Sequence, residues 1–109
     1  MITLQIKRSE FQQIASGVKK IEYRSPSLFN KRKLLKKNEN GEYDVNSEDK
    51  CVLFINGYKH DAQRLLCEVI SITPIRFTSR FVDDINGFIA EAGECTIEIV
   101  LGKILKGGI

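Results

Sequence analysis

The sequence is poor in the residues that bind metals and form disulfides. Its 109 residues include only three cysteines and one histidine, and no two cysteines form a C-x-x-C pair. A structural zinc site needs three or four Cys or His ligands, so it would have to use nearly all of four scattered residues: Cys51, Cys67, Cys95 and His60. Because each cysteine lies in an apolar stretch, we predict three buried strand residues. We expect no metal and no cofactor.

Long apolar runs and phosphate-binding loops are also absent. No run approaches the roughly 20 apolar residues that a membrane-spanning helix requires, and residues 1–7 lack the apolar core of a signal peptide. Neither G-x-G-x-x-G nor G-x-x-x-x-G-K-[ST] occurs. Hydrophobic residues make up 42% and charged residues 28%, close to the average of globular proteins. We therefore expect one cytoplasmic domain over residues 1–109, with no membrane partner.

The charge is distributed unevenly, although the net charge is only +3. Residues 1–37 contain ten Lys or Arg against two acids, whereas residues 38–49 contain five acids and no base. Half of the ten cations fall within seven positions: Lys31, Arg32, Lys33, Lys36 and Lys37. Such a run can contact the phosphates of a nucleic acid, or it can be a solvated surface loop. Charge alone does not choose between the two.

Apolar residues alternate with polar ones in the first quarter of the chain, which predicts strands at residues 2–6 and 20–24. Between them, Ser9 and Gln12 fit a capping box, which predicts a helix over 9–16 that Gly17 ends. In the second strand, the alternation places Ile21 and Tyr23 on one face. Three charged residues share the other face: Lys20, Glu22 and Arg24.

The rest of the chain predicts further strands at 51–55, at 65–72 with an extension at 75–77, and at 95–101 with a continuation to 105. The polar segment 27–49 reads as a long loop, in which Leu28, Phe29, Leu34 and Leu35 can form a short helical pad. Ser79 is predicted to cap a second helix, closed by Gly93, with one apolar stripe: Phe81, Val82, Ile85, Phe88 and Ile89. This order predicts an α+β fold, a small curved sheet or barrel of five or six strands with two short helices.

Three features can carry chemistry, and each has an alternative interpretation. Charges side by side on the strand at 20–24 suit a wet cleft, where a crowded lysine can act as a base or nucleophile, or they suit a solvated edge strand. The turn Asn56-Gly57-Tyr58 offers amide and ring contacts to a planar ligand, or is an ordinary hairpin turn. Glu68 lies within an apolar strand, facing either outward or into a cavity.

These features occur in an order that resembles the ASCH domain family, small domains related to the RNA-binding PUA fold. The resemblance covers residues 2 to about 105, and it depends on four motifs: Ile14-x-Ser16-Gly17-x-Lys19-x-Ile21-Glu22-x-Arg24, then Phe54-x-Asn56-Gly57-Tyr58, then Cys67-Glu68-Val69, then Ile99-x-Leu101-Gly102-x-Ile104. It implies a PUA-like β-barrel with a helix packed at one end and a cleft beside the first motif.

The resemblance also implies an RNA or nucleoside-like partner. We expect its ligand contacts to come from the first two motifs, at Lys19, Lys20, Glu22, Arg24, Asn56, Gly57 and Tyr58, and its phosphate contacts from the basic run. The chain is expected to be a monomer or a weak dimer.

An enzymatic alternative follows from the same resemblance. Some bacterial members of the family are amidohydrolases that remove the acetyl group of N4-acetylcytidine, using a lysine, a threonine three residues later and a distant glutamate. Lys19 matches the lysine, but Glu22 stands at the threonine position, and a carboxylate cannot replace a hydroxyl nucleophile. Glu68, or less securely Glu91, would be the distant glutamate. The sequence therefore favours binding, with hydrolysis through Lys19, Glu22 and Glu68 as the alternative.

Overall fold

A five-stranded mixed sheet organises the chain, and the computed structural model describes residues 1–107 of it; the last two residues of the predicted domain lie outside the described residues. The elements follow one another as β1 (Ile2–Ile6), α1 (Arg8–Ala15), β2 (Ile21–Arg24), α2 (Leu28–Leu34), β3 (Lys36–Lys37), β4 (Tyr43–Val45), β5 (Cys51–Asn56), β6 (Arg64–Arg76), β7 (Phe81–Asp83), β8 (Phe88–Ala90) and β9 (Cys95–Lys106).

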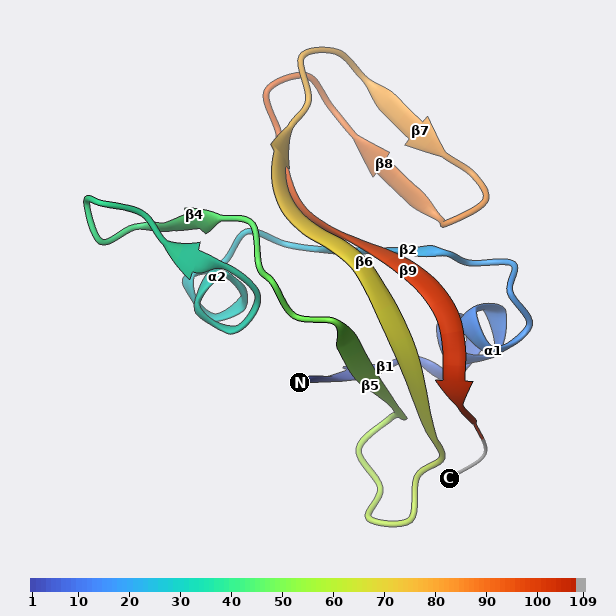
Figure 1. Cartoon of the computed structure of the whole chain (residues 1–109). Helices are drawn as coiled ribbons and strands as arrows, with labels where there is room; N and C mark the ends of the chain where they lie inside the picture. The colour runs from blue at the N-terminus through green and yellow to red at the C-terminus, as the bar shows by residue number, and fades with distance from the viewer. Residues whose placement is uncertain (108–109) are drawn as a thin grey trace.

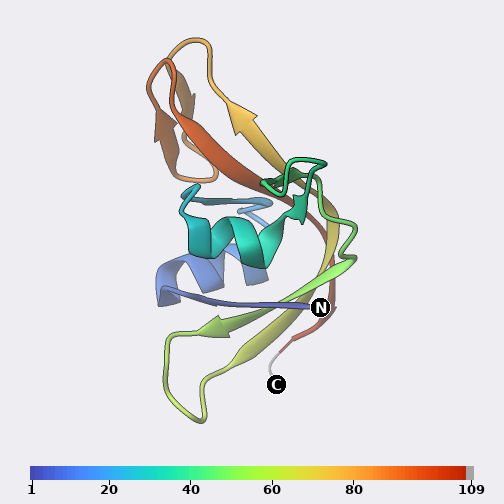
Figure 2. The ribbon, with the colours of Figure 1, turned by 90° about the vertical axis from the view of Figure 1, so that its left-hand side faces the viewer.

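The main sheet has the order β1-β5-β6-β9-β2. Only the pair β1–β5 is parallel, and the other pairs are antiparallel. The sheet curls strongly into a half-barrel, and α1 and α2 lie on its concave side (Figures 1 and 2). The predicted α+β fold with a curved sheet and two short helices is confirmed. The ladder stays open, because β1 and β2 are its two edge strands.

The core fills the space between the concave face and the helices. Along β1, and along β9 from Ile97 to Leu101, every second residue is buried, as the alternation predicts. Along β6 the buried positions run Leu65, Cys67, Val69 and then Ile72, because the register against β9 shifts between Val69 and Ser71. A bulge of this kind changes which face the following residues point to and bends the strand. It thereby contributes to the curl that brings the sheet edges toward each other.

Two local predictions for the helices are wrong. Helix α1 begins at Arg8 with Lys7 as its N-cap and has no side-chain cap, so Ser9 lies inside the first turn. No helix forms over 79–93; instead β7 and β8 pair as a hairpin around Asn86-Gly87. Asn-Gly is a strong hairpin signal, Gly87 has a positive φ of 70°, and the Asp83 carboxylate accepts from the Asn86 backbone N–H. This turn chemistry outweighs the helical spacing of the apolar residues.

The segment 27–49 is more ordered than a long loop. The predicted helical pad is confirmed as α2, whose N-cap Ser27 accepts a hydrogen bond from the backbone N–H of Asn30. Leu34 at the end of α2 and its C-cap Leu35 are buried, whereas Leu28 and Phe29 at the start are exposed. The cysteines differ from the prediction: Cys67 is buried, Cys51 is half-buried and Cys95 is exposed. Within residues 1–107, neither helix is long and apolar enough to cross a membrane.

Candidate functional site

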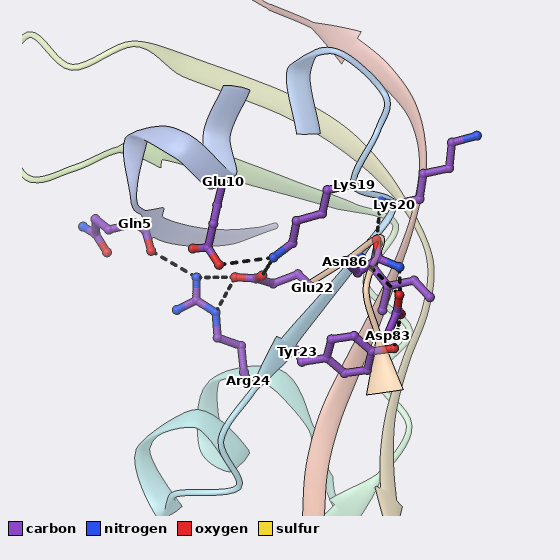
Figure 3. Close-up of polar contacts among 10 residues, drawn as sticks. Gln5, Glu10, Lys19, Lys20, Glu22, Tyr23, Arg24, Asp83 and Asn86 are labelled. Carbon is purple, nitrogen blue, oxygen red and sulfur yellow. Dashed lines mark hydrogen bonds and ion pairs between the residues drawn. The ribbon is translucent and has the colours of Figure 1, made fainter. Parts of the chain in front are cut away.

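Strand β2 places a buried carboxylate between two cations. Glu22 is 4% exposed, and its two carboxylate oxygens contact different partners. Lys19 Nζ lies 2.9 Å from Glu22 Oε1, and Arg24 Nη2 lies 2.9 Å from Glu22 Oε2 (Figure 3). The Lys19 side chain is 3% exposed and that of Arg24 is 23% exposed. The alternation of the strand thus directs Glu22 and Arg24 inward together, and Lys19 joins them from the preceding turn.

Two residues from other elements complete this network. Glu10 on α1 lies on the other side of Lys19, with its Oε1 3.3 Å from Lys19 Nζ. Arg24 Nη2 donates to the backbone carbonyl of Gln5 on β1 at 3.0 Å. Since β1 and β2 are opposite edges of the sheet, this arginine bridges the opening of the half-barrel with a side chain where no backbone ladder closes it.

The network lies at a cleft of about 500 Å³. Its walls come from α1, both edge strands, the turn after β5 and the hairpin turn, at Gln5, Ile6, Lys7, Glu10, Lys19, Glu22, Tyr23, Arg24, Gly57, Tyr58, Asn86, Gly87 and Phe88. Tyr58 projects from the β5–β6 turn with 88% of its surface exposed. The cleft therefore combines hydrogen-bond donors, carboxylate acceptors and aromatic rings, which is a combination suited to a planar polar ligand.

The hairpin turn is fixed to β2 by a second set of hydrogen bonds. Asn86 Oδ1 accepts from the backbone N–H groups of Lys20 and Ile21 at 2.8 and 3.0 Å. Tyr23 donates its phenol to Asp83 at 2.9 Å, and its ring stacks on Phe88 with centroids 4.0 Å apart. Together these contacts hold the aromatic wall of the cleft in place.

These contacts change the protonation behaviour of two groups. Burial, followed by the hydrogen bond and charge of Asp83, raises the pKa of the Tyr23 phenol well above its ordinary value. Burial opposes ionisation of Asp83, but hydrogen bonds from Asn86 and Tyr23 outweigh it and lower the pKa of that carboxyl. The pair is thus an ionised acceptor and a neutral donor over a wide pH range.

The structure brings together only part of the predicted site. Gly57 and Tyr58 line the cleft with Lys19, Glu22 and Arg24, but Asn56 does not. Lys20 is exposed and points away from the network (Figure 3), because β2 begins at Ile21 and the strict alternation does not extend back to residue 20.

Both candidates for the distant glutamate lie elsewhere. Glu68 Oε1 accepts from the backbone N–H of Lys103 on β9, and the Glu91 carboxylate pairs with Arg80 at 3.2 Å. Neither residue lines the cleft. Besides Glu22, the carboxylate that contacts Lys19 is that of Glu10 on the preceding helix α1. The sequence analysis missed Glu10 because nothing in the helical spacing separates it from an ordinary solvated residue.

The basic run lies on α2 and β3, outside the cleft lining. Lys36 pairs with Glu48 at 3.0 Å. Lys33 lies over the Phe29 ring at 5.8 Å and Lys37 over the Tyr43 ring at 5.3 Å, measured to the ring centroids. The cations are therefore interleaved with aromatic rings, an arrangement that spacing along the chain does not reveal.

Within the part of the chain that the structure describes, no three His, Cys, Asp or Glu side chains gather where they could hold a metal ion. Comparisons of the chain with protein-family models, curated proteins and solved structures find no match.

Proposed function

We propose that this protein is a PUA-like domain of the ASCH type that binds a nucleoside-like ligand, free or within RNA, in the cleft beside β2. The observation that carries the proposal is the convergence of Glu10, Lys19, Glu22 and Arg24 on one cleft that Tyr58 and Phe88 flank. A nucleobase has two flat faces and an edge of donors and acceptors. Aromatic rings match the faces, and the guanidinium and carboxylate match the edge.

The arrangement of the charges explains why a ligand would be recognised specifically. The Arg24 guanidinium has five N–H donors, of which the Glu22 carboxylate and the Gln5 carbonyl occupy only part. Glu10 keeps carboxylate capacity beyond its contact with Lys19, and its side chain is 39% exposed. A base edge that offers both an acceptor and a donor would satisfy both residues at once. Because the network is already held by ion pairs, little ordering is required on binding.

The geometry favours binding over hydrolysis. In the family pattern a hydroxyl stands where this chain has Glu22, and here both oxygens of that carboxylate are engaged by cations. The Lys19 ammonium in turn lies between two carboxylates. Two carboxylate oxygens thereby occupy the Lys19 amine on both sides, whereas a nucleophile must have access to the substrate carbonyl.

Binding is tested by titrating cytidine, N4-acetylcytidine, uridine, adenosine and guanosine into the protein in a calorimeter. Tyr58→Ala removes an exposed ring and should weaken binding by about 5- to 150-fold, the range for loss of one base stack. Arg24→Gln should weaken it by about 10-fold or more, because a hydrogen bond to a charged donor is lost. The matched controls are His60→Ala on the same turn and Lys20→Gln on the adjacent, outward position. Equal affinity in all four variants, or no binding of any nucleoside, contradicts the proposal.

The enzymatic alternative is tested with the same protein. Incubation with N4-acetylcytidine, followed by chromatography of the nucleosides, should show no conversion to cytidine by the unmodified chain. Turnover that Lys19→Ala abolishes would replace the binding function with the hydrolase. Activity that arises only in Glu22→Thr would show that the scaffold is competent and that the missing hydroxyl prevents the reaction.

A further inference from the structure

A second surface next to the cleft combines exposed apolar and cationic side chains. On α2, Phe29 is 72% exposed and Leu28 is 59% exposed. Together with Arg32 and Lys33 they line a shallow hollow of about 520 Å³. We call these four residues the α2 surface. A short helix that packs its apolar side inward has no structural need for an exposed phenylalanine, so the ring is available to a partner.

The charges of the α2 surface show which kind of partner fits. Within residues 1–107, no carboxylate lies within ion-pair distance of Arg32 or Lys33, whereas the nearby Lys36 is paired with Glu48. Lys33 covers Phe29 with its ammonium 5.8 Å from the ring centroid. Arg32 also lines a neighbouring hollow with Glu42 and Asp44, without an ion pair to either. An aromatic ring beside cations that form no ion pair is the arrangement that binds single-stranded nucleic acids, in which bases stack and phosphates pair with the cations.

The α2 surface lies within reach of a strand that occupies the cleft. Strand β2 follows α1 and precedes α2 along the chain, and both helices lie on the concave side of the sheet (Figures 1 and 2). Arg24 in the cleft and Phe29 on α2 are five residues apart, so their Cα atoms are separated by no more than about 18 Å. A stacked strand rises about 3.4 Å per nucleotide. A segment of about five nucleotides therefore spans the two places.

We propose that the ligand of the cleft is one nucleotide of a single-stranded RNA, and that the α2 surface binds a neighbouring part of that strand, with a base stacked on Phe29 and phosphates on Arg32 and Lys33. This inference rests on the proposed function for the identity of the cleft ligand. It adds that the protein recognises a single-stranded RNA and not a free nucleoside alone.

The test uses a fluorescein-labelled RNA hexanucleotide series, measured by fluorescence anisotropy, beside calorimetry with the best nucleoside. The unmodified protein should bind the best hexanucleotide more tightly than the nucleoside. Phe29→Ala should weaken hexanucleotide binding by about 5- to 150-fold and leave nucleoside binding unchanged. The double variant Arg32→Gln/Lys33→Gln should reduce the slope of log affinity against log salt by about 1.4, or 0.7 per phosphate. The controls are Leu105→Ala and Lys103→Gln/Lys106→Gln, exposed changes on β9.

The outcomes separate this inference from the proposed function. If nucleosides bind but the hexanucleotide binds no more tightly than they do, the α2 surface is not an RNA contact and the cleft assignment stands. The same conclusion follows if Phe29→Ala binds the hexanucleotide as tightly as the unmodified protein does. If Phe29→Ala removes RNA binding while Tyr58→Ala and Arg24→Gln do not, the α2 surface stands and the cleft assignment is wrong. Phe29-dependent binding to vesicles with 30% anionic lipid, without RNA binding, would overturn the inference in favour of a membrane partner.

Discussion

Glu22→Gln tests whether the charged network at the cleft behaves as a buried one. The substitution keeps the size of the side chain and removes its charge. Lys19 then retains only the partly exposed Glu10, and Arg24 retains the Gln5 carbonyl. Because the Lys19 and Glu22 side chains are at most 4% exposed, we expect the cost of breaking a buried ion pair, about 3–5 kcal/mol.

That loss is large for a chain of this size. A domain of about 100 residues has a free energy of unfolding of about 5–15 kcal/mol, so a loss of about 3–5 kcal/mol removes about a fifth of it or more. At about 4 °C for each kcal/mol, Tm should fall by roughly 12–20 °C. The assay is urea and thermal unfolding followed by circular dichroism, with Glu10→Gln as the matched control. Since Glu10 is 39% exposed and Lys19 keeps Glu22 in that variant, its loss should stay below about 1 kcal/mol.

A third variant separates stability from function. In Lys19→Met/Glu22→Leu/Arg24→Met, apolar side chains of similar length replace the three charged residues at β2, while the partly exposed Glu10 stays. In other proteins, replacing a buried ion-pair network in this way is often neutral or stabilising. We expect this variant to be more stable than Glu22→Gln and to bind no nucleoside. If Glu22→Gln instead costs less than 1 kcal/mol, like Glu10→Gln, the network is hydrated and the reasoning from burial is wrong.

Two further predictions follow from individual ionisable groups. Since the folded protein holds the Tyr23 proton more tightly than the unfolded chain does, the stability from this proton is complete below about pH 10 and declines as the pH rises toward the elevated folded pKa. Urea unfolding between pH 8 and 11.5 should show this decline in the unmodified protein and in the control Tyr58→Phe, and less of it in Tyr23→Phe. Identical pH profiles for all three proteins would refute the prediction. Burial raises the pKa of the Cys67 thiol to about 11, so an aromatic disulfide reagent at pH 8 should modify the exposed Cys95 rapidly and Cys67 only after unfolding. Fast labelling of Cys67 in the folded Cys95→Ser variant would contradict the burial of Cys67.

The strands and part of the cleft are readable from local sequence patterns. Alternation along residues 2–6 and 95–101 found strands whose inward residues are buried, because one side of the sheet packs on the core and the other meets solvent. Gly17, with a positive φ of 81°, ends the first helix as expected. Glu22 and Arg24 were recognised because charged residues that share one face of a strand require either water or partners. Lys19 was recognised through its place in the motif that resembles the ASCH family.

Segment 79–93 shows where a local pattern misleads. Its apolar residues fit one face of a helix, and the same residues also serve a hairpin. The choice was made by Asn86, Gly87 and Asp83 in the turn and by the stacking of Phe88 on Tyr23, which is 65 residues away in the chain. A periodicity in one segment contains no information about that distant ring, so the helix was predicted and the hairpin formed.

The partners of the charged residues were decided by the curl of the sheet. Gln5 precedes β2 by more than ten residues, and its carbonyl meets Arg24 because β1 and β2, at opposite edges of one sheet, curve toward each other. Glu10 reaches Lys19 from the helix that directly precedes β2. The start of β2 at Ile21 likewise turned Lys20 outward. The sequence specified which side chains carry charge and which way a strand turns them, whereas the contacts between them depend on strand pairing over long separations, which alternation cannot encode.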